Sequence, residues 1–227
     1  RYGLVGSEMC IRDRSKRVFD IVAKDVPAYE IYSIDEAFLD FSGIKDPYNY
    51  ALHLRDKVKR WTGIPISIGI SYTKTLSKVA GHIAKKSSDG VCLLNNEGRI
   101  DKILSFLPVD EIWGVGMRYA MKLKKYDIHT AKDLRGCDES WVRKMMNVVG
   151  LRMVRELKCI PHFNLEEDRS MKKSICTSRS FSVEITEYSR MSEYLSMFAS
   201  RCSEKLRSEG ACAVSYTHLR AHETVSH

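Results

Sequence analysis

The sequence predicts an α+β protein built from several small domains. Helix-like and strand-like patterns alternate along the first half of the chain, up to Pro108. Residues 112–158 then show only short helical periods joined by glycine-containing turns, and the pattern changes again after Asp168. The domains expected from these changes cover residues 15–107, 108–168 and 169–214.

Composition and charge narrow the class of protein. The 227 residues include 37 Lys and Arg against 29 Asp and Glu, a net charge of +8 that favours a polyanionic partner such as nucleic acid or an anionic membrane surface. No run of about 18 apolar residues is present, so we expect no membrane-spanning helix. The seven cysteines are scattered, without a CxxC pair or metal-ligand spacing. They favour reduced thiols in a cytoplasmic protein.

The two ends of the chain differ from its interior and resemble translated adapter sequence. Residues 1–14 and 215–227 show no apolar period, and the chain does not begin with Met. We predict that both segments are non-native and unordered, and we leave them out of the fold prediction.

Apolar spacing predicts the elements of the first domain in order. Four segments have a helical period, the first ended by Pro27 and the third capped by Thr73. These helices are expected over residues 15–26, 50–61, 73–85 and 97–106. Alternating or branched residues predict a strand–turn–strand over 31–41 and strands over 65–72 and 91–94.

The rest of the chain has fewer signals. Several short helices are expected within residues 112–158. Beyond Asp168 the pattern predicts a strand over 172–185, a long helix over 188–207 and the start of another strand over 211–214.

Two adjacent carboxylates, Asp35 and Glu36, lie in the string SIDEAFLD. Neighbouring residues on a strand point to opposite faces, so both can face one site only where a turn or bulge aims them there. Paired carboxylates on a rigid sheet suit Mg²⁺, and two such ions can assist phosphoryl transfer. The dipeptide by itself equally describes a solvated hairpin end.

Longer strings change that interpretation. YSIDEAFLDFSG, IPISIGISYTKTLSKVAGHIAKK and LPVDEIWGVG occur in an order and spacing that resemble the Y-family of translesion DNA polymerases, in particular the error-prone UmuC type. The resemblance covers residues 15–214. It implies a partial polymerase palm, an all-helical thumb with a helix-hairpin-helix, and a truncated little-finger domain, in the order of the three predicted domains.

The resemblance also implies roles for the acidic pair. Asp35 would be a metal ligand, and Glu36 would help to position Mg²⁺ and the primer 3′ hydroxyl. The family's third carboxylate, on the first palm strand, and its fingers segment are not found in this sequence. We therefore expect the fragment itself to be inactive.

A run of lysines follows the acidic pair in the sequence. By resemblance, Lys85 would contact the incoming triphosphate, for which a lysine is a suitable point charge. Its neighbour Lys86 is the alternative, and the lysines of this helix also fit a solvated basic face.

A second candidate site lies in the string IWGVGMRYAMK. Gly114 and Gly116 permit a tight turn, and the helix that follows presents free N–H groups to a phosphate. Arg118 and Lys122 add positive charge. Such a hairpin grips nucleic-acid backbone without reading sequence. The alternative is an ordinary helix turn with glycine caps.

In the last domain, Lys172, Lys173 and Arg179 are candidate contacts to template phosphates by resemblance. The alternative is a charged strand edge that discourages aggregation.

The partners implied by the resemblance are primer-template DNA, dNTP, a UmuD-like subunit and the sliding clamp. Two other functions stay open. One is a non-catalytic DNA-binding module built around the hairpin. The other is a different palm enzyme such as a nucleotide cyclase, against which the hairpin and the basic last segment argue.

Overall fold

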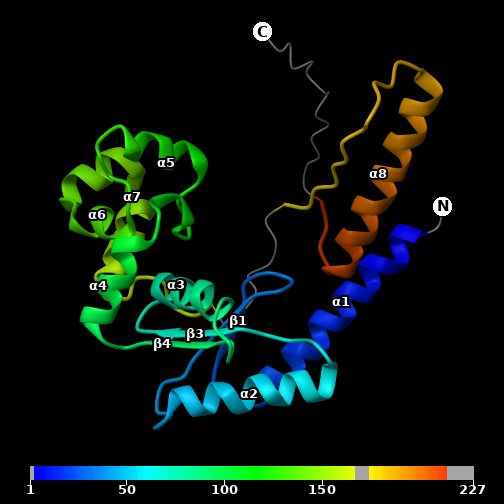
Figure 1. Ribbon diagram of the computed structural model, residues 1–227. Helices are drawn as coiled ribbons and strands as arrows, with labels where there is room; N and C mark the ends of the chain where they lie inside the picture. The colour runs from blue at the N-terminus through cyan, green and yellow to red at the C-terminus, as the bar shows by residue number, and fades with distance from the viewer. Residues whose placement is uncertain (1–2, 167–173, 214–227) are drawn as a thin grey trace. The chain divides into compact units, whose positions relative to one another are not determined.

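The computed structural model describes residues 3–166 and 174–213 (Figure 1). The chain forms two compact units, Arg1–Glu167 and Asp168–His227. The boundary between the units lies where the sequence pattern changes after Asp168.

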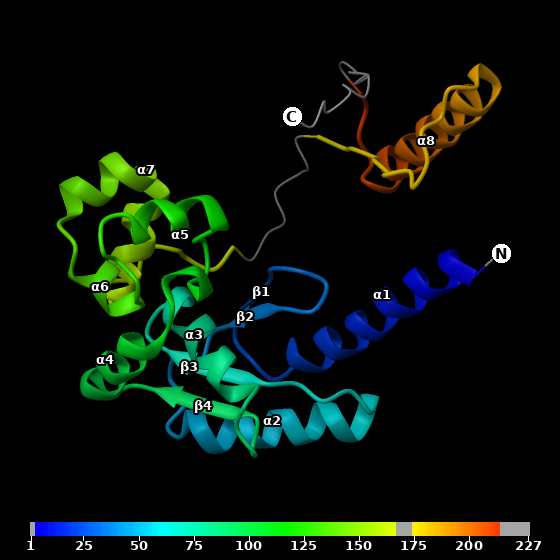
Figure 2. The ribbon, with the colours of Figure 1, turned by 45° about the horizontal axis from the view of Figure 1, so that its top comes forward.

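A small parallel sheet lies between two helices at the centre of the larger unit. Strands β3 (Ile68–Ser71) and β4 (Val91–Leu94) pair in parallel, with Ile68 opposite Val91. Helix α3 (Lys74–Ala84) covers one face, and α2 (Pro47–Thr62) covers the other (Figure 2). Alternation along β4 sends Val91 toward α2 and its neighbour Cys92 toward the α3 side.

The ends of these helices follow from local side chains. Thr73 accepts a hydrogen bond from the Leu76 N–H, which confirms the predicted N-cap of α3. Asp46 caps α2 ahead of Pro47, and Gly63 ends that helix in the left-handed region at φ 72°.

Gly69 of β3 lets α3 approach the sheet closely. A Cβ on Gly69 would lie 2.0 Å from the Gly81 backbone nitrogen and 2.5 Å from the Ser77 carbonyl oxygen. These neighbours are backbone atoms, so no rotamer change can relieve the contact. A side chain at position 69 would therefore force α3 away from the sheet.

We expect Gly69→Ala to lower the free energy of unfolding by about 2 kcal/mol, because overpacking of this kind shifts backbone. Urea unfolding followed by tryptophan fluorescence measures the change. The matched control is Gly81→Ala, whose Cβ would meet no atom within 4 Å. It should be neutral or stabilising by up to about 1 kcal/mol, since alanine is the better helix former. Equal effects of the two substitutions would contradict the close-packing argument.

Helix α1 (Gly3–Val22) begins earlier than predicted. We expected residues 1–14 to be unordered and the helix to start at Ser15. That prediction is wrong for residues 3–14, which are helical. Once Ile21 and Val22 are packed in the core beside α2, the helix can propagate through a segment that has no proline and needs no apolar stripe.

Helices make up the rest of the larger unit, as the sequence predicts. Their bounds are α4 Glu97–Phe106, the 3₁₀ turn η1 Val109–Glu111, α5 Met117–Lys124, α6 Ala131–Gly136 and α7 Glu139–Leu157. Helix α7 is interrupted at Asn147, whose φ of 64° is non-helical.

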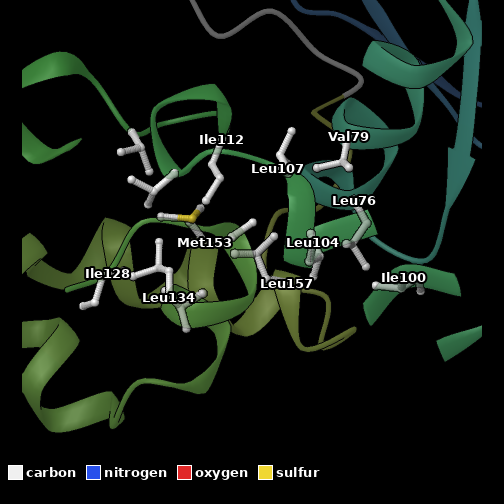
Figure 3. Close-up of a cluster of buried hydrophobic side chains, with 14 of the residues drawn as sticks. Leu76, Val79, Ile100, Leu104, Leu107, Ile112, Ile128, Leu134, Met153 and Leu157 are labelled. Carbon is white, nitrogen blue, oxygen red and sulfur yellow. The ribbon is translucent and has the colours of Figure 1, made fainter. Parts of the chain in front are cut away.

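One buried hydrophobic cluster joins these helices to the sheet. Leu76 of α3 and Leu104 of α4 lie in the same cluster as Ile112, Leu134 and Leu157 (Figure 3). The core is thus continuous across Pro108, where the sequence suggests a domain boundary. Residues on the two sides of Pro108 therefore pack as one unit.

The smaller unit contains α8 (Tyr188–Ser208), close to the helix predicted over residues 188–207. The strand predicted over 172–185 is wrong for residues 174–185, which have no strand, and 211–213 have none either. Alternating residues form a strand only where another strand satisfies their backbone groups, and the described part of this unit offers none. Within the described part of the chain, no helix is long and apolar enough to cross a membrane.

Candidate active site

The two carboxylates lie at the turn of a β-hairpin. Strands β1 (Tyr29–Ile31) and β2 (Ala37–Leu39) pair antiparallel, which confirms the predicted strand–turn–strand. The Glu36 carbonyl oxygen accepts hydrogen bonds of 3.0 Å from the N–H groups of residues 32 and 33 and closes the turn. Because Asp35 and Glu36 lie outside the regular strands, they are free of the alternation that would send them to opposite faces.

Both carboxylates line one cleft of about 1160 Å³ in the larger unit. Asp35 is exposed, and its Oδ1 accepts a hydrogen bond of 2.6 Å from the Ser33 hydroxyl. Helix α3 forms another side of the cleft and contributes Lys74, Lys78 and Lys85. The cleft therefore combines hard oxygen ligands with positive charge.

Lys78 contacts one carboxylate of the acidic pair directly. Its ammonium lies 2.6 Å from Oε2 of Glu36 and over the rings of Tyr32, Phe38 and Trp113, at 4.8, 5.7 and 5.8 Å from their centroids. We call these three rings the aromatic cage. Trp113 also donates a hydrogen bond of 3.1 Å from Nε1 to the Tyr32 hydroxyl, which ties two walls of the cage together.

Lys85 lies at the C-cap of α3 and is exposed, and it lines the cleft. Lys86 is exposed as well and is not among the residues that line the cleft. Lys78 and Lys85 are seven residues apart and so share one helix face. The resemblance predicts a role for Lys85, whereas the sequence pattern indicates no more than a solvated basic face for Lys78.

A buried carboxylate in α7, Glu156, also lines the cleft, and it was not predicted from the sequence. Glu156 is fully buried. Its Oε2 accepts from the N–H and hydroxyl of Thr75, at 2.9 and 2.8 Å, and its Oε1 accepts from the N–H groups of His162 and Phe163, at 3.1 and 3.0 Å. The Phe163 ring in turn packs against Trp113 at 5.7 Å.

The glycine-containing turn of the predicted helix-hairpin-helix lies between η1 and α5. Gly114 has a φ of 91°, which favours glycine, whereas Gly116 has an ordinary φ of −76° and caps α5 without a side-chain hydrogen bond. The flanking Ile112 and Val115 are buried and fix the turn to the core. The first N–H groups of α5 thus have no side-chain cap.

Basic side chains surround the start of α5. Arg118 is exposed, and Lys122 donates a hydrogen bond of 3.1 Å to the Met145 carbonyl. Lys124 donates to Asp110, which lowers the pKa of that carboxyl. Lys122 therefore has a structural contact in addition to its charge.

Comparison with known proteins identifies the family of the chain. Two models match the chain: the impB/mucB/samB family over residues 9–82 and its C-terminal domain over residues 172–221. The chain is 41% identical to protein UmuC of Salmonella typhimurium over 203 residues, and 38% identical to protein MucB of Escherichia coli over 200 residues. The chain belongs to the impB/mucB/samB family.

The chain spans about half the length of these relatives. The match to UmuC takes in 87% of this chain and 48% of UmuC, and the match to MucB takes in 86% and 48%. Solved structures show the same fold at low identity. A Y-family DNA polymerase chimera built on Dbh has a TM-score of 0.68 at 19% identity, and an insertion ternary complex of Dbh DNA polymerase has 0.61 at 18%. Each match covers 87% of this chain and 58% of the other.

The acidic pair supplies some of the oxygen ligands that a hard divalent cation needs. Mg²⁺ is commonly held by one or two carboxylates together with substrate phosphates, and Asp35 and Glu36 supply two carboxylates on one cleft. No group of three or more His, Cys, Asp or Glu side chains that could hold a metal occurs among the described residues. The described side chains thus supply part of a coordination shell.

The candidate DNA contacts of the smaller unit are only partly visible. Lys172 and Lys173 lie outside the described residues. Arg179 is exposed in a segment without regular secondary structure. The role of these three residues as template contacts stays a prediction.

Proposed function

We propose that this chain is part of an error-prone, DNA-directed DNA polymerase for translesion synthesis. The observation that carries the proposal is the hairpin turn that presents Asp35 and Glu36 to one cleft beside Lys85, in a chain 41% identical to UmuC. Primer extension tests it, in a chimera that joins the N-terminal segment of UmuC to this chain.

Each cleft residue has a role in this proposal. Asp35 and Glu36 would hold Mg²⁺, which supplies charge stabilisation at the attacking and leaving oxygens of nucleotidyl transfer. Glu36 would also position the primer 3′ hydroxyl. Lys85 would neutralise the triphosphate of the dNTP, because its exposed side chain lines the cleft.

The finer domain layout belongs to the same proposal. Residues 15–107 would be a partial palm, 108–168 a helical thumb and 169–214 a truncated little finger. The continuous core across Pro108 supports a thumb that is anchored rigidly on the palm. The proposed setting is the bacterial cytoplasm, with a UmuD-like subunit and the sliding clamp as partners.

Primer-template DNA would be held by its backbone. The uncapped start of α5 after Gly116, together with Arg118 and Lys122, supports a phosphate contact that is indifferent to sequence. Lys172, Lys173 and Arg179 would contact the template strand. The same hairpin supports the second candidate function, a DNA-binding module without catalysis.

We expect Arg118→Ala to weaken duplex binding by roughly threefold to tenfold, equally for unrelated sequences, and to reduce the salt dependence by about one released counterion. Fluorescence anisotropy with labelled duplexes at several salt concentrations measures both quantities. The control is Lys102→Ala, which removes the same charge from an exposed position on α4. A loss of affinity that depends on base sequence would contradict the backbone-grip proposal.

A further inference from the structure

Glu36 has a cation of its own. The Lys78 ammonium pairs with Oε2 at 2.6 Å, and the two side chains keep 21% and 38% of their exposure, so the pair is shielded from solvent in part. The other oxygen, Oε1, has no hydrogen-bond partner among the described residues. Glu36 is therefore paired on one side and open on the other.

The aromatic cage fixes where this ammonium lies. Tyr32 and Phe38 come from the hairpin and its flank, and Trp113 comes from the turn before α5. Three ring centroids lie within 5.8 Å of the ammonium, a range at which a ring face attracts a cation. This enclosure distinguishes the Lys78–Glu36 pair from an exposed ion pair, which contributes little to stability.

We propose that Lys78 is a positioning residue that acts as the built-in counter-cation of Glu36 and competes with a divalent metal ion for that carboxylate. The inference rests on the proposed function, because it takes Asp35 and Glu36 as the metal site. It goes beyond that function by giving a role to a lysine outside the acidic pair and by predicting how tightly the site binds metal.

The direction of the effect follows from what else holds Glu36. The hairpin turn fixes its backbone through two hydrogen bonds to its carbonyl oxygen, independently of Lys78. Substitution of Lys78 should therefore leave the main chain at Glu36 in place. It removes a positive charge close to the proposed metal position. A unit charge about 4 Å from a divalent ion weakens binding by roughly thirtyfold in a water-like dielectric, and screening at ordinary ionic strength lowers this to roughly tenfold.

The test is Mn²⁺ binding to the 227-residue chain, with free Mn²⁺ followed by electron paramagnetic resonance. Mn²⁺ takes the same oxygen ligands as Mg²⁺ and reports binding without any catalytic step. We expect Lys78→Met to bind Mn²⁺ roughly tenfold more tightly than the unmodified chain. Lys78→Arg, which keeps the charge, should bind about as the unmodified chain does.

Lys74→Met is the matched control. Lys74 is one turn earlier on α3, lies 4.9 Å from the centroid of the Phe38 ring and pairs with Glu30 rather than with the acidic pair. It should leave Mn²⁺ affinity within about twofold. Circular dichroism checks that each variant is folded, and Lys78→Gln removes the same charge if the methionine variant does not fold.

The outcomes separate this inference from the proposed function. Loss of Mn²⁺ binding in Asp35→Asn supports the metal site, and an unchanged affinity in that variant overturns the proposed site and the inference with it. If Asp35→Asn loses binding but Lys78→Met binds Mn²⁺ equally or more weakly, the inference alone is overturned. If Lys74→Met also binds Mn²⁺ more tightly, the gain comes from the general loss of positive charge, and the inference about Lys78 is overturned.

Discussion

Asp35→Ala is expected to abolish primer extension by a chimera that joins the N-terminal segment of Salmonella typhimurium UmuC to residues 15–213 of this chain. Glu36→Ala should do the same. Each substitution removes an oxygen ligand from the proposed Mg²⁺ site, where developing charge is stabilised most strongly. We expect a loss of roughly a thousandfold in rate, equivalent to about 4 kcal/mol of transition-state stabilisation. Extension of a labelled primer on a gel measures it.

The control stays within the same hairpin. Asp40 follows β2, and its Oδ1 accepts from the Ser42 N–H at 2.8 Å, so Asp40→Asn keeps the acceptor and should extend primers normally. The 227-residue chain without the UmuC segment should not extend primers, because its described residues offer no third metal ligand beside Asp35 and Glu36. Activity of the Asp35→Ala chimera would remove the metal-site assignment.

The central part of the fold could be predicted from sequence because its signals are local. The cap at Thr73, the stop at Gly63 and the hairpin around Asp35 each depend on a few neighbouring residues and a known backbone preference. The acidic pair was found for the same reason, since its string is contiguous.

What the sequence did not predict depends on partners far away in the chain. The strand expected over 174–185 has the right residue types but no pairing partner in the described unit. Lys78 meets Glu36 across 42 positions, and its cage includes Trp113, so its role depends on tertiary packing. Glu156 looks like any exposed glutamate of an amphipathic helix, and only the fold shows that it is buried.

Glu156→Gln should lower the free energy of unfolding by about 3 kcal/mol. The carboxylate accepts two hydrogen bonds on each oxygen, whereas an amide has one acceptor oxygen and an NH₂ group. In either orientation the NH₂ would face two donors, those of Thr75 or those of His162 and Phe163. Buried donors left without an acceptor cost about 1–3 kcal/mol each. Urea unfolding followed by tryptophan fluorescence measures the change, since all three tryptophans lie in the larger unit.

Glu139→Gln is the matched control on the same helix. Glu139 is half-exposed and pairs with Arg155 at 2.6 Å, whose hydrogen bond lowers the pKa of this carboxyl, and solvent can replace that contact. Its unfolding midpoint should barely move. If Glu156→Gln is equally mild, then Glu156 does not hold the segment that carries Phe163. If the variant is destabilised as expected, the emission of Trp113 should also change in the folded state, because Phe163 would lose its anchored position against that ring.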